Sequence, residues 1–225
     1  MRNLTVLAYH KVNNSDKNAL SVSVENFEKQ MEYLRVNGYH VISHEELLNK
    51  IKKSTEIDKK TVVITFDDGH KDNYGFAYPI FKKYGYTATI FLSISFIGKE
   101  NFLSWDEIKI MRDSGIFFGA HTVNHPHLTQ IENEQARKEI IESKLILEKE
   151  LGKKCLSFCY PYGDTNDGIK DLVKECGFEM AFITPPKSGL KEDLLYIKRV
   201  GIYHHTDMLQ FKFKIWGVYS FLKRR

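Results

Sequence analysis

The chain has 225 residues, 42% of them apolar, a length sufficient for one sizeable hydrophobic core and short for two. Its 33 lysines and arginines against 29 acidic residues give a formal net charge of +4. The basic residues form no dense block, so nucleic-acid binding is not predicted. Three cysteines without a CxxC pair exclude a disulfide framework, and we expect buried thiols in a reducing compartment.

Strands and helices are predicted to alternate along the chain. In order, the pattern favours strands over residues 4–9, 39–42, 61–66, 87–93, 116–120, 156–160 and 180–184, and helices over residues 23–38, 43–53, 74–85, 104–115, 131–151 and 167–177. Repeated strand–helix units indicate an α/β fold with a parallel sheet. Because about seven strands occur without a glycine-rich GxGxxG turn, a closed or partly closed barrel is favoured over a dinucleotide-binding sheet.

The two ends of the chain carry different expectations. The opening MRNLTVLAYHKV lacks the apolar length and the cleavage site of a secretory signal, and no stretch reaches the roughly 18 apolar residues of a membrane span. We therefore expect a cytoplasmic protein. Residues 211–225, FKFKIWGVYSFLKRR, mix apolar side chains with five basic ones and are treated as a tail. This tail is expected to pack on the domain or to contact the inner face of a membrane.

Short motifs with polar residues follow several predicted strands, at the end where barrel enzymes place their chemistry. The residues of these motifs are Asp67, Asp68 and Gly69 after strand 61–66, His121 and His125 after strand 116–120, Pro161 and Tyr162 after strand 156–160, and His10 after strand 4–9.

His121 and His125 are four residues apart, which brings both imidazoles to one side if the segment makes a short helical turn. Pro126 disfavours helical geometry at His125, so a strand-to-loop corner is expected. Two imidazoles and one carboxylate leave coordination positions open, as in catalytic zinc sites, and the same set suits Fe²⁺. The alternative is a histidine-bearing surface loop.

The adjacent carboxylates of Asp67 and Asp68 would repel each other unless a cation lay nearby. A divalent ion would neutralise one of them and allow the other to stay ionised as a base. Consecutive side chains of an extended strand point to opposite sides, so the two residues are expected to have different roles. Gly69 permits the turn that follows. An Asx-capped turn is the alternative explanation of this motif.

The motifs TFDDG, HTVNHPHLT and FCYPYG, in this order, resemble the NodB homology domain of polysaccharide deacetylases, also called carbohydrate esterase family 4. The likeness includes LAYHKV and ESKLILEKELGK and extends to about residue 205. It implies a distorted (β/α) barrel, here residues 1–210, that hydrolyses N-acetyl groups of amino sugars or O-acetyl groups of some glycans. Many members carry an arginine where this chain has Cys159, and the chain is similar to the subset with FxYPYG instead.

The resemblance also implies roles for individual residues. Asp67 would be the general base, and Asp68, His121 and His125 would bind a divalent metal, with Zn²⁺ favoured over Co²⁺, Ni²⁺ or Fe²⁺. The backbone N–H of Tyr162 would stabilise the oxyanion. Pro161 and Tyr162 would shape the acetyl pocket. An aromatic rim is expected to add a sugar-binding face, formed by Tyr74, Phe102, Trp105, Tyr160 and Tyr162.

Two further roles are predicted near the end of the domain. The general acid is expected from VGIYHHTD, which offers His204 or His205, with His10 as the second candidate. Arg199 is expected to pair with Asp67 from the other side of the barrel, because an unpaired buried carboxylate would have a raised pKa. The alternative for Arg199 is a position on the surface.

The predicted substrate is an acetylated glycan, and the absence of a leader favours a glycan precursor or a lipid-linked sugar at the membrane face. A metal-dependent amidase acting on a small amide and a non-catalytic glycan-binding relative are the alternatives. The aromatic rim favours a sugar over a small amide. The intact Asp67 argues against a purely binding protein, since sugar binding does not require a base.

Overall fold

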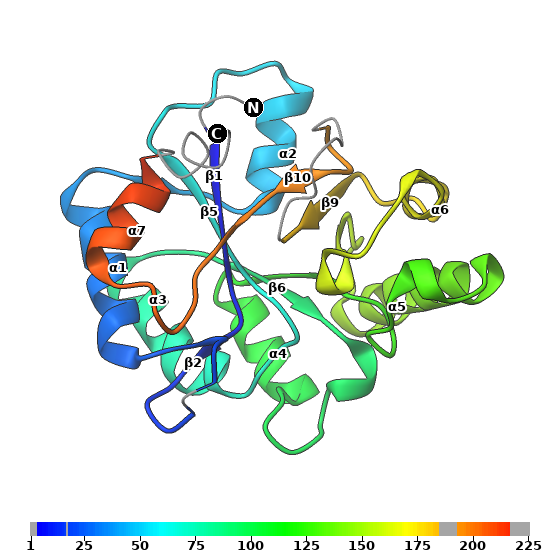
Figure 1. The fold of residues 1–225 in the computed structure, drawn as a ribbon, viewed down its shortest axis with the longest axis horizontal. Coiled ribbons are helices and arrows are strands. Elements are labelled where there is room, and N and C mark those ends of the chain that lie inside the picture. Colours follow the sequence, from blue (N-terminus) through cyan, green and yellow to red (C-terminus); the bar gives the residue numbers. More distant parts are fainter. Residues whose placement is uncertain (1–3, 17, 185–192, 217–225) are drawn as a thin grey trace.

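The computed structural model describes residues 4–16, 18–184 and 193–216, which form a parallel β-barrel surrounded by helices (Figure 1). The strands are β1 (Leu4–Tyr9), β2 (Lys11–Val12), β3 (Ser21–Val22), β4 (His40–Val41), β5 (Thr61–Phe66), β6 (Thr89–Leu92), β7 (Phe117–Ala120), β8 (Ser157–Cys159), β9 (Met180–Ile183), β10 (Ile197–Lys198) and β11 (Val200–Gly201). The helices are α1 (Val24–Val36), α2 (His44–Lys52), α3 (Tyr78–Tyr84), α4 (Trp105–Asp113), α5 (Asn133–Leu151), α6 (Asp167–Glu175) and α7 (Met208–Ile215). Short helical turns are η1 (Asn73–Ala77), η2 (Ile94–Phe96), η3 (Leu128–Gln130) and η4 (Pro161–Gly163).

Residues 197–201 close the barrel. β10 pairs with β9, and β11 pairs with β1, so the strand order β10-β9-β8-β7-β6-β5-β1-β11 begins and ends in the same short segment. Between the two strands, the N–H of Arg199 donates to the Ile183 carbonyl at 3.0 Å. With this segment counted once, seven strands form the ring, and all their pairings are parallel. The predicted distorted (β/α) barrel is confirmed.

The membership of the ring differs in one respect from the sequence prediction. The short strand predicted over residues 39–42 is β4. Among the described strands it pairs only with the beginning of β5, and it lies off the ring. The segment 197–201 takes the seventh place instead. Its two short strands are interrupted at Arg199, so hydrophobic periodicity identifies them poorly.

Successive side chains of a strand point alternately into and out of the barrel, and this alternation determines which of them lie in its interior. In β5, Val62, Ile64 and Phe66 belong to the core between sheet and helices, whereas Val63 belongs to the separate interior cluster. Period-two geometry therefore directs Thr65 and Asp67 inward, on the side of Val63. The same rule directs Cys159 inward, since it belongs to the interior cluster and Phe158 to the outer core.

The helix starts follow local capping rules. Ser23 and Ser43 each accept a hydrogen bond from a backbone N–H of the first turn of α1 and α2, respectively. Ser104 and Glu107 form a capping box at the start of α4. The helix predicted over residues 74–85 is divided into η1, a π-helical turn, and α3. A wider turn fits there because Pro79 has no N–H to donate to the preceding turn.

Helix α7 crosses the predicted boundary at residue 210. Phe211 is fully buried in the main core, and its ring lies edge-on to Tyr33 of α1, the neighbouring helix in Figure 1. The first part of the predicted tail is therefore packed on the barrel, and residues 217–225 lie outside the described residues. Cys155, Cys159 and Cys176 are free and buried, as predicted. Among the described helices, none has the length and apolar character needed to cross a membrane.

Candidate active site

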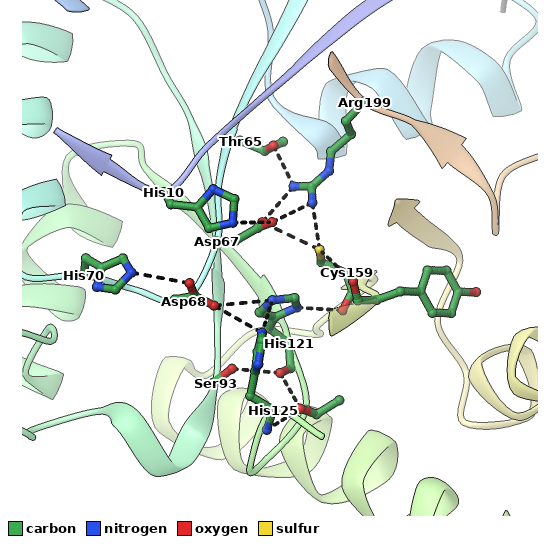
Figure 2. Close-up of polar contacts among 12 residues, drawn as sticks. His10, Thr65, Asp67, Asp68, His70, Ser93, His121, His125, Cys159 and Arg199 are labelled. Atoms are coloured by element: carbon green, nitrogen blue, oxygen red, sulfur yellow. Dashed lines mark hydrogen bonds and ion pairs between the residues drawn. The ribbon is translucent and has the colours of Figure 1, made fainter. Parts of the chain in front are cut away.

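Several of the predicted site residues gather where the barrel strands end (Figure 2). His10 follows β1, Asp67 and Asp68 follow β5, His121 follows β7, and Cys159 ends β8. Because parallel strands all point the same way, their carboxyl ends meet at one mouth of the barrel. Residues far apart in the chain are therefore brought together there.

Asp67 and Arg199 form a buried ion pair. The Arg199 guanidinium donates from Nη1 to Oδ1 at 2.7 Å and from Nη2 to Oδ2 at 2.6 Å, and Nη1 also donates to Thr65 Oγ1 at 2.9 Å. The predicted contact is confirmed, and the surface alternative is wrong, since Arg199 is 3% exposed. Burial would raise the pKa of Asp67, but the charge and hydrogen bonds of Arg199 outweigh this effect and lower the pKa to about 2. Asp67 is therefore ionised at neutral pH.

Asp68 points away from Asp67 toward two imidazoles. Its φ of 71° is left-handed, which turns the chain out of the strand at this residue. Asp68 Oδ1 lies 3.5 Å from His121 Nε2 and 3.3 Å from His125 Nε2, and the two nitrogens lie 3.1 Å apart. Three ligand atoms bound tetrahedrally at about 2.0–2.1 Å from a zinc ion would be about 3.3–3.4 Å apart. The triangle therefore has the size expected of a metal site.

The chemistry of the three atoms also fits a cation. His121 Nδ1 lies 2.7 Å from the Cys159 carbonyl, which can only accept, so the proton is on Nδ1 and the lone pair of Nε2 faces the site. Asp68 Oδ1 is buried and accepts no hydrogen bond from the described residues. Burial and His121 lower the pKa of His125 to about 4, which keeps that imidazole neutral. The anionic Asp68 Oδ1 faces the Nε2 lone pairs of His121 and His125. These three atoms repel one another unless a cation lies between them.

His70 contacts the other oxygen of the same carboxylate. His70 Nε2 lies 3.3 Å from Asp68 Oδ2, and its ring stacks on Phe102 with centroids 4.9 Å apart. Burial would raise the pKa of Asp68, but the contact with His70 and the neighbouring imidazoles lower it well below the ordinary value. The carboxylate thus presents Oδ1 alone to the two histidines (Figure 2).

The histidine loop is not the helical turn that the four-residue spacing allowed. Residues 121–127 form an irregular loop in which Thr122 and His125 have φ values of 67° and 59°. Two left-handed residues reverse the chain within five positions, and this reversal brings the imidazoles together. The expected corner at the strand end is confirmed. The surface-loop alternative is wrong, because His121 is 2% exposed.

The candidate acids are placed differently from the first expectation. His204 and His205 are exposed, and within the described residues neither forms a hydrogen bond or ion pair with Asp67 or Asp68. The His204 N–H donates to the Ala19 carbonyl instead. His10 Nε2 lies 3.8 Å from Asp67 Oδ2. The structure thus brings His10, rather than His204, to the site, because β11 ends before the chain reaches residue 204.

The third motif places its residues on two sides of the backbone. Tyr162 is 56% exposed, has a left-handed φ of 58°, and lies with its ring edge-on to His125 at 4.5 Å. Its N–H donates to none of the described residues. Pro161 is buried. The expectation that Tyr160 belongs to the rim is wrong: it is 1% exposed, and its hydroxyl donates to the Leu195 carbonyl.

The remaining rim residues are half-buried. Phe102 stacks on His70, and Phe96 of η2 lies between Phe102 and His125, with centroids 4.7 and 5.9 Å away. Tyr74 and Trp105 pack against the main core. The aromatic side chains beside the histidines are therefore Phe96, Phe102 and Tyr162, of which sequence reasoning missed Phe96.

Glu139 of α5 was also missed. It is 7% exposed and accepts hydrogen bonds from the histidine loop. The available signal was a charged residue within the buried face of α5, where Ala136, Ile140 and Ser143 are its neighbours. A buried acid needs a partner, and none was visible in the sequence.

Comparisons with known proteins agree with this site. The family model described as polysaccharide deacetylase matches residues 52–181, more than half of the chain. The Bacillus subtilis protein YxkH is 32% identical and is matched over 86% of this chain and 68% of its own length. The poly-beta-1,6-N-acetyl-D-glucosamine N-deacetylase of Staphylococcus aureus is 31% identical over 83% of this chain and 74% of its length. The structure of the deacetylase PplD of Streptococcus pyogenes with acetate superposes with a TM-score of 0.86 at 27% identity, covering 94% of this chain and 97% of that one.

The motifs, the barrel and the site therefore have one common explanation. The carboxylate that faces two imidazoles lies beside a second, ionised carboxylate, and both lie in a barrel that superposes on a deacetylase. The chain belongs to the polysaccharide deacetylase family, and it is a hydrolase that removes acetyl groups from a glycan.

Proposed function

We propose that this chain is a zinc-dependent N-deacetylase acting on a polymer of N-acetylglucosamine. The observation that carries the proposal is the pair of adjacent carboxylates with different surroundings, Asp67 on Arg199 and Asp68 on His121 and His125. The choice of polymer is supported by the Staphylococcus aureus relative, whose name gives poly-beta-1,6-N-acetyl-D-glucosamine as its substrate.

Asp68, His121 and His125 would hold the metal. When bound, the metal lowers the pKa of water and polarises the acetyl carbonyl. The Cys159 carbonyl orients His121 by accepting a hydrogen bond from its Nδ1–H, and His70 orients Asp68 by its contact with Oδ2. Two imidazoles and one carboxylate agree with the ligand preferences of Zn²⁺.

Asp67 acts as the general base. Arg199 keeps its carboxylate ionised and fixes its orientation through two hydrogen bonds, so that it accepts the proton of the attacking water. The N–H of Tyr162 donates to the oxyanion that develops as water adds to the acetyl carbon. Pro161 and the Tyr162 ring border the space for the acetyl group.

His10 is the general acid in this proposal. The leaving amine must be protonated, and His10 is the described histidine outside the metal set that lies close to Asp67, at 3.8 Å. Its position on the Asp67 side of the site, rather than the Asp68 side, suits a proton relay between the two groups (Figure 2).

The experiment is a measurement of released acetate. The purified protein, treated with a chelator and reloaded with Zn²⁺, is incubated with β-1,6-linked and β-1,4-linked N-acetylglucosamine oligomers, with acetylxylan and with a small acetylated amide. Release from the N-acetylglucosamine oligomers, absent in Asp67→Asn, supports the proposal. Release confined to acetylxylan or to the small amide would contradict it in favour of an O-deacetylase or an amidase. No release from any substrate would favour a binding protein.

A second proposal concerns location. Leu209, Phe213 and Trp216 are exposed along one side of α7, and Lys212 lies beside them. This apolar side, next to the basic sequence at the end of the chain, suits the headgroup region of an anionic bilayer at the inner membrane face. Sedimentation with vesicles containing phosphatidylglycerol tests it. Phe213→Ser with Trp216→Ser should reduce the bound fraction, and equal binding by both proteins would contradict the proposal.

A further inference from the structure

The loop that carries His125 has an unfavourable backbone. Thr122 and His125 both adopt left-handed φ values, which are unfavourable for residues with a Cβ atom. Thr122 is β-branched as well. Such a conformation persists only if contacts from outside the loop hold it. The position of the His125 imidazole therefore depends on what holds residues 121–125.

The loop carbonyls are held by the neighbouring turn. The Ser93 hydroxyl donates to the His121 carbonyl at 2.9 Å, and the N–H groups of Ile94 and Ser95 donate to the carbonyls of Thr122 and Val123 at 3.2 and 2.9 Å. These bonds fix the acceptor side of the loop. They leave the N–H groups of Val123 and Asn124 to be satisfied elsewhere.

Glu139 of α5 satisfies both of these donors. Its Oε2 accepts from the N–H of Val123 at 2.9 Å and from the N–H of Asn124 at 2.8 Å, and its Oε1 accepts from Asn124 Nδ2 at 2.7 Å. Glu139 is 7% exposed, so these charge-assisted bonds lie largely out of water. Within the described residues, no other side chain accepts from these two backbone N–H groups.

We infer that Glu139 is a positioning residue for the metal site, acting through the loop on His125. Its three hydrogen bonds end at Val123 and Asn124, the two residues before His125, so they determine where that imidazole stands relative to Asp68 and His121. The inference rests on the proposed role of His125 as a ligand. Residues in an outer shell of this kind typically change metal affinity by about 10–100-fold.

The test measures metal binding directly. The dissociation constant for Zn²⁺ is determined by competition with a chromophoric chelator, and the visible spectrum of the Co²⁺-loaded protein reports ligand geometry. Glu139→Gln removes the negative charge that strengthens the hydrogen bonds to the loop, and its NH₂ group takes the place of Oε1 beside the Asn124 amide. We expect its dissociation constant to rise about 10–100-fold, with a changed Co²⁺ spectrum and an unchanged far-ultraviolet circular dichroism spectrum.

Glu142→Gln is the matched control. It removes the same charge one turn further along α5, where Glu142 faces Lys138 at 3.8 Å. Asn124→Asp is a second variant at an exposed position, and it places a carboxylate against Glu139 Oε1. Because this position is exposed, the Asn124→Asp chain should fold even if the Glu139→Gln chain does not fold. It should also bind the metal more weakly than the unaltered chain.

The outcomes separate the inference from the ligand assignment. If His125→Ala loses the metal while Glu139→Gln and Asn124→Asp bind it like Glu142→Gln, the inference about Glu139 is overturned and the ligand role stands. If His125→Ala binds the metal like the unaltered chain, the ligand role itself is overturned. Weakened binding in Glu139→Gln or Asn124→Asp, together with loss in His125→Ala, supports both.

Discussion

Arg199 and Asp67 are 132 residues apart in the chain and meet inside the barrel through two parallel hydrogen bonds, at 2.7 and 2.6 Å. Arg199 lies in the segment that closes the barrel, between its contacts with β9 and with β1. The residue that completes the ring of strands therefore also holds the proposed base. A buried carboxylate without this partner would be costly to ionise.

Arg199→Met should lower activity about tenfold or more and move the acidic limb of the pH–rate profile to higher pH. The sign follows from the two opposing effects on Asp67: burial raises its pKa, and Arg199 lowers it. Without Arg199 the carboxylate binds a proton at higher pH and loses its function as a base there. The measurement is kcat/KM between pH 4 and pH 9. An unchanged rate and profile would contradict the positioning role.

Cys159→Ala is the control for this prediction. The Cys159 thiol lies 3.0 Å from Arg199 Nη2, but it carries no charge, because burial raises its pKa well above the ordinary value. Alanine keeps the backbone carbonyl that accepts the hydrogen bond from His121 Nδ1–H. We therefore expect only a slight decrease in activity and no movement of the acidic limb.

Substitutions of Asp67 and Asp68 should affect catalysis and metal binding differently. Asp67→Asn should bind Zn²⁺ nearly as tightly as the unaltered chain, while turnover falls roughly 100-fold or more, the usual scale for the loss of a general base. Asp68→Asn should lose the metal and the activity together. Calorimetric titration of each variant decides the matter. Loss of metal in Asp67→Asn with retention in Asp68→Asn would reverse the assigned roles.

Substitutions at His10 and His204 distinguish the two candidates for the general acid. His10→Gln should lower kcat by roughly 100-fold or more and remove the basic limb of the pH–rate profile, since a general acid must hold a proton. His204→Gln should leave both unchanged, because His204 is exposed and its backbone contacts Ala19 rather than the site. The opposite pattern would return the role to His204.

Gly69→Ala should disturb the site through its backbone. Gly69 has a φ of +74°, and a Cβ atom there would lie 2.6 Å from Leu92 Cδ2. We expect a loss of roughly 2–3 kcal/mol in the free energy of unfolding and weaker metal binding, since Asp68 is adjacent. Gly85→Ala isolates the backbone effect, because its φ is +67° and no atom lies within 4 Å, so about 1 kcal/mol is expected. If urea titrations show the same loss in the free energy of unfolding for both variants, the steric contribution of the contact with Leu92 is excluded.

His44 should make the stability of the chain depend on pH. It is 2% exposed beside Thr89, and burial lowers its pKa to about 3. Between that value and the ordinary 6.5, only the unfolded chain binds the proton, so stability is lost as the pH falls below about 6.5. This one group should remove about 2 kcal/mol between pH 7 and pH 5. In urea titrations, the free energy of unfolding of His44→Phe should decrease less between pH 7 and pH 5 than that of the unaltered chain. His40→Gln, at an exposed position, serves as the control. An unchanged decrease in His44→Phe would contradict the prediction.

The sequence by itself was sufficient for the βα order, the capped helix starts and the positions of the site motifs. These features depend on neighbouring residues: Ser104 and Glu107 cap α4 within one turn, and alternation along TVVITF already places Asp67 on the side of Val63. The strand ends then place His10, Asp67, Asp68 and His121 at one mouth, because parallel strands share a direction.

Only the tertiary structure decided the contacts made across the barrel. Whether His10 or His204 stands beside Asp67 depends on how far β11 runs before the chain turns outward. Whether Tyr160 faces the solvent depends on the pairing of β8 with β9, which continues to the Tyr160 N–H and leaves its ring buried. The contact of Glu139 with the histidine loop depends on how α5 packs on β7. Each of these outcomes is determined by packing between segments distant in the chain, which local periodicity does not encode.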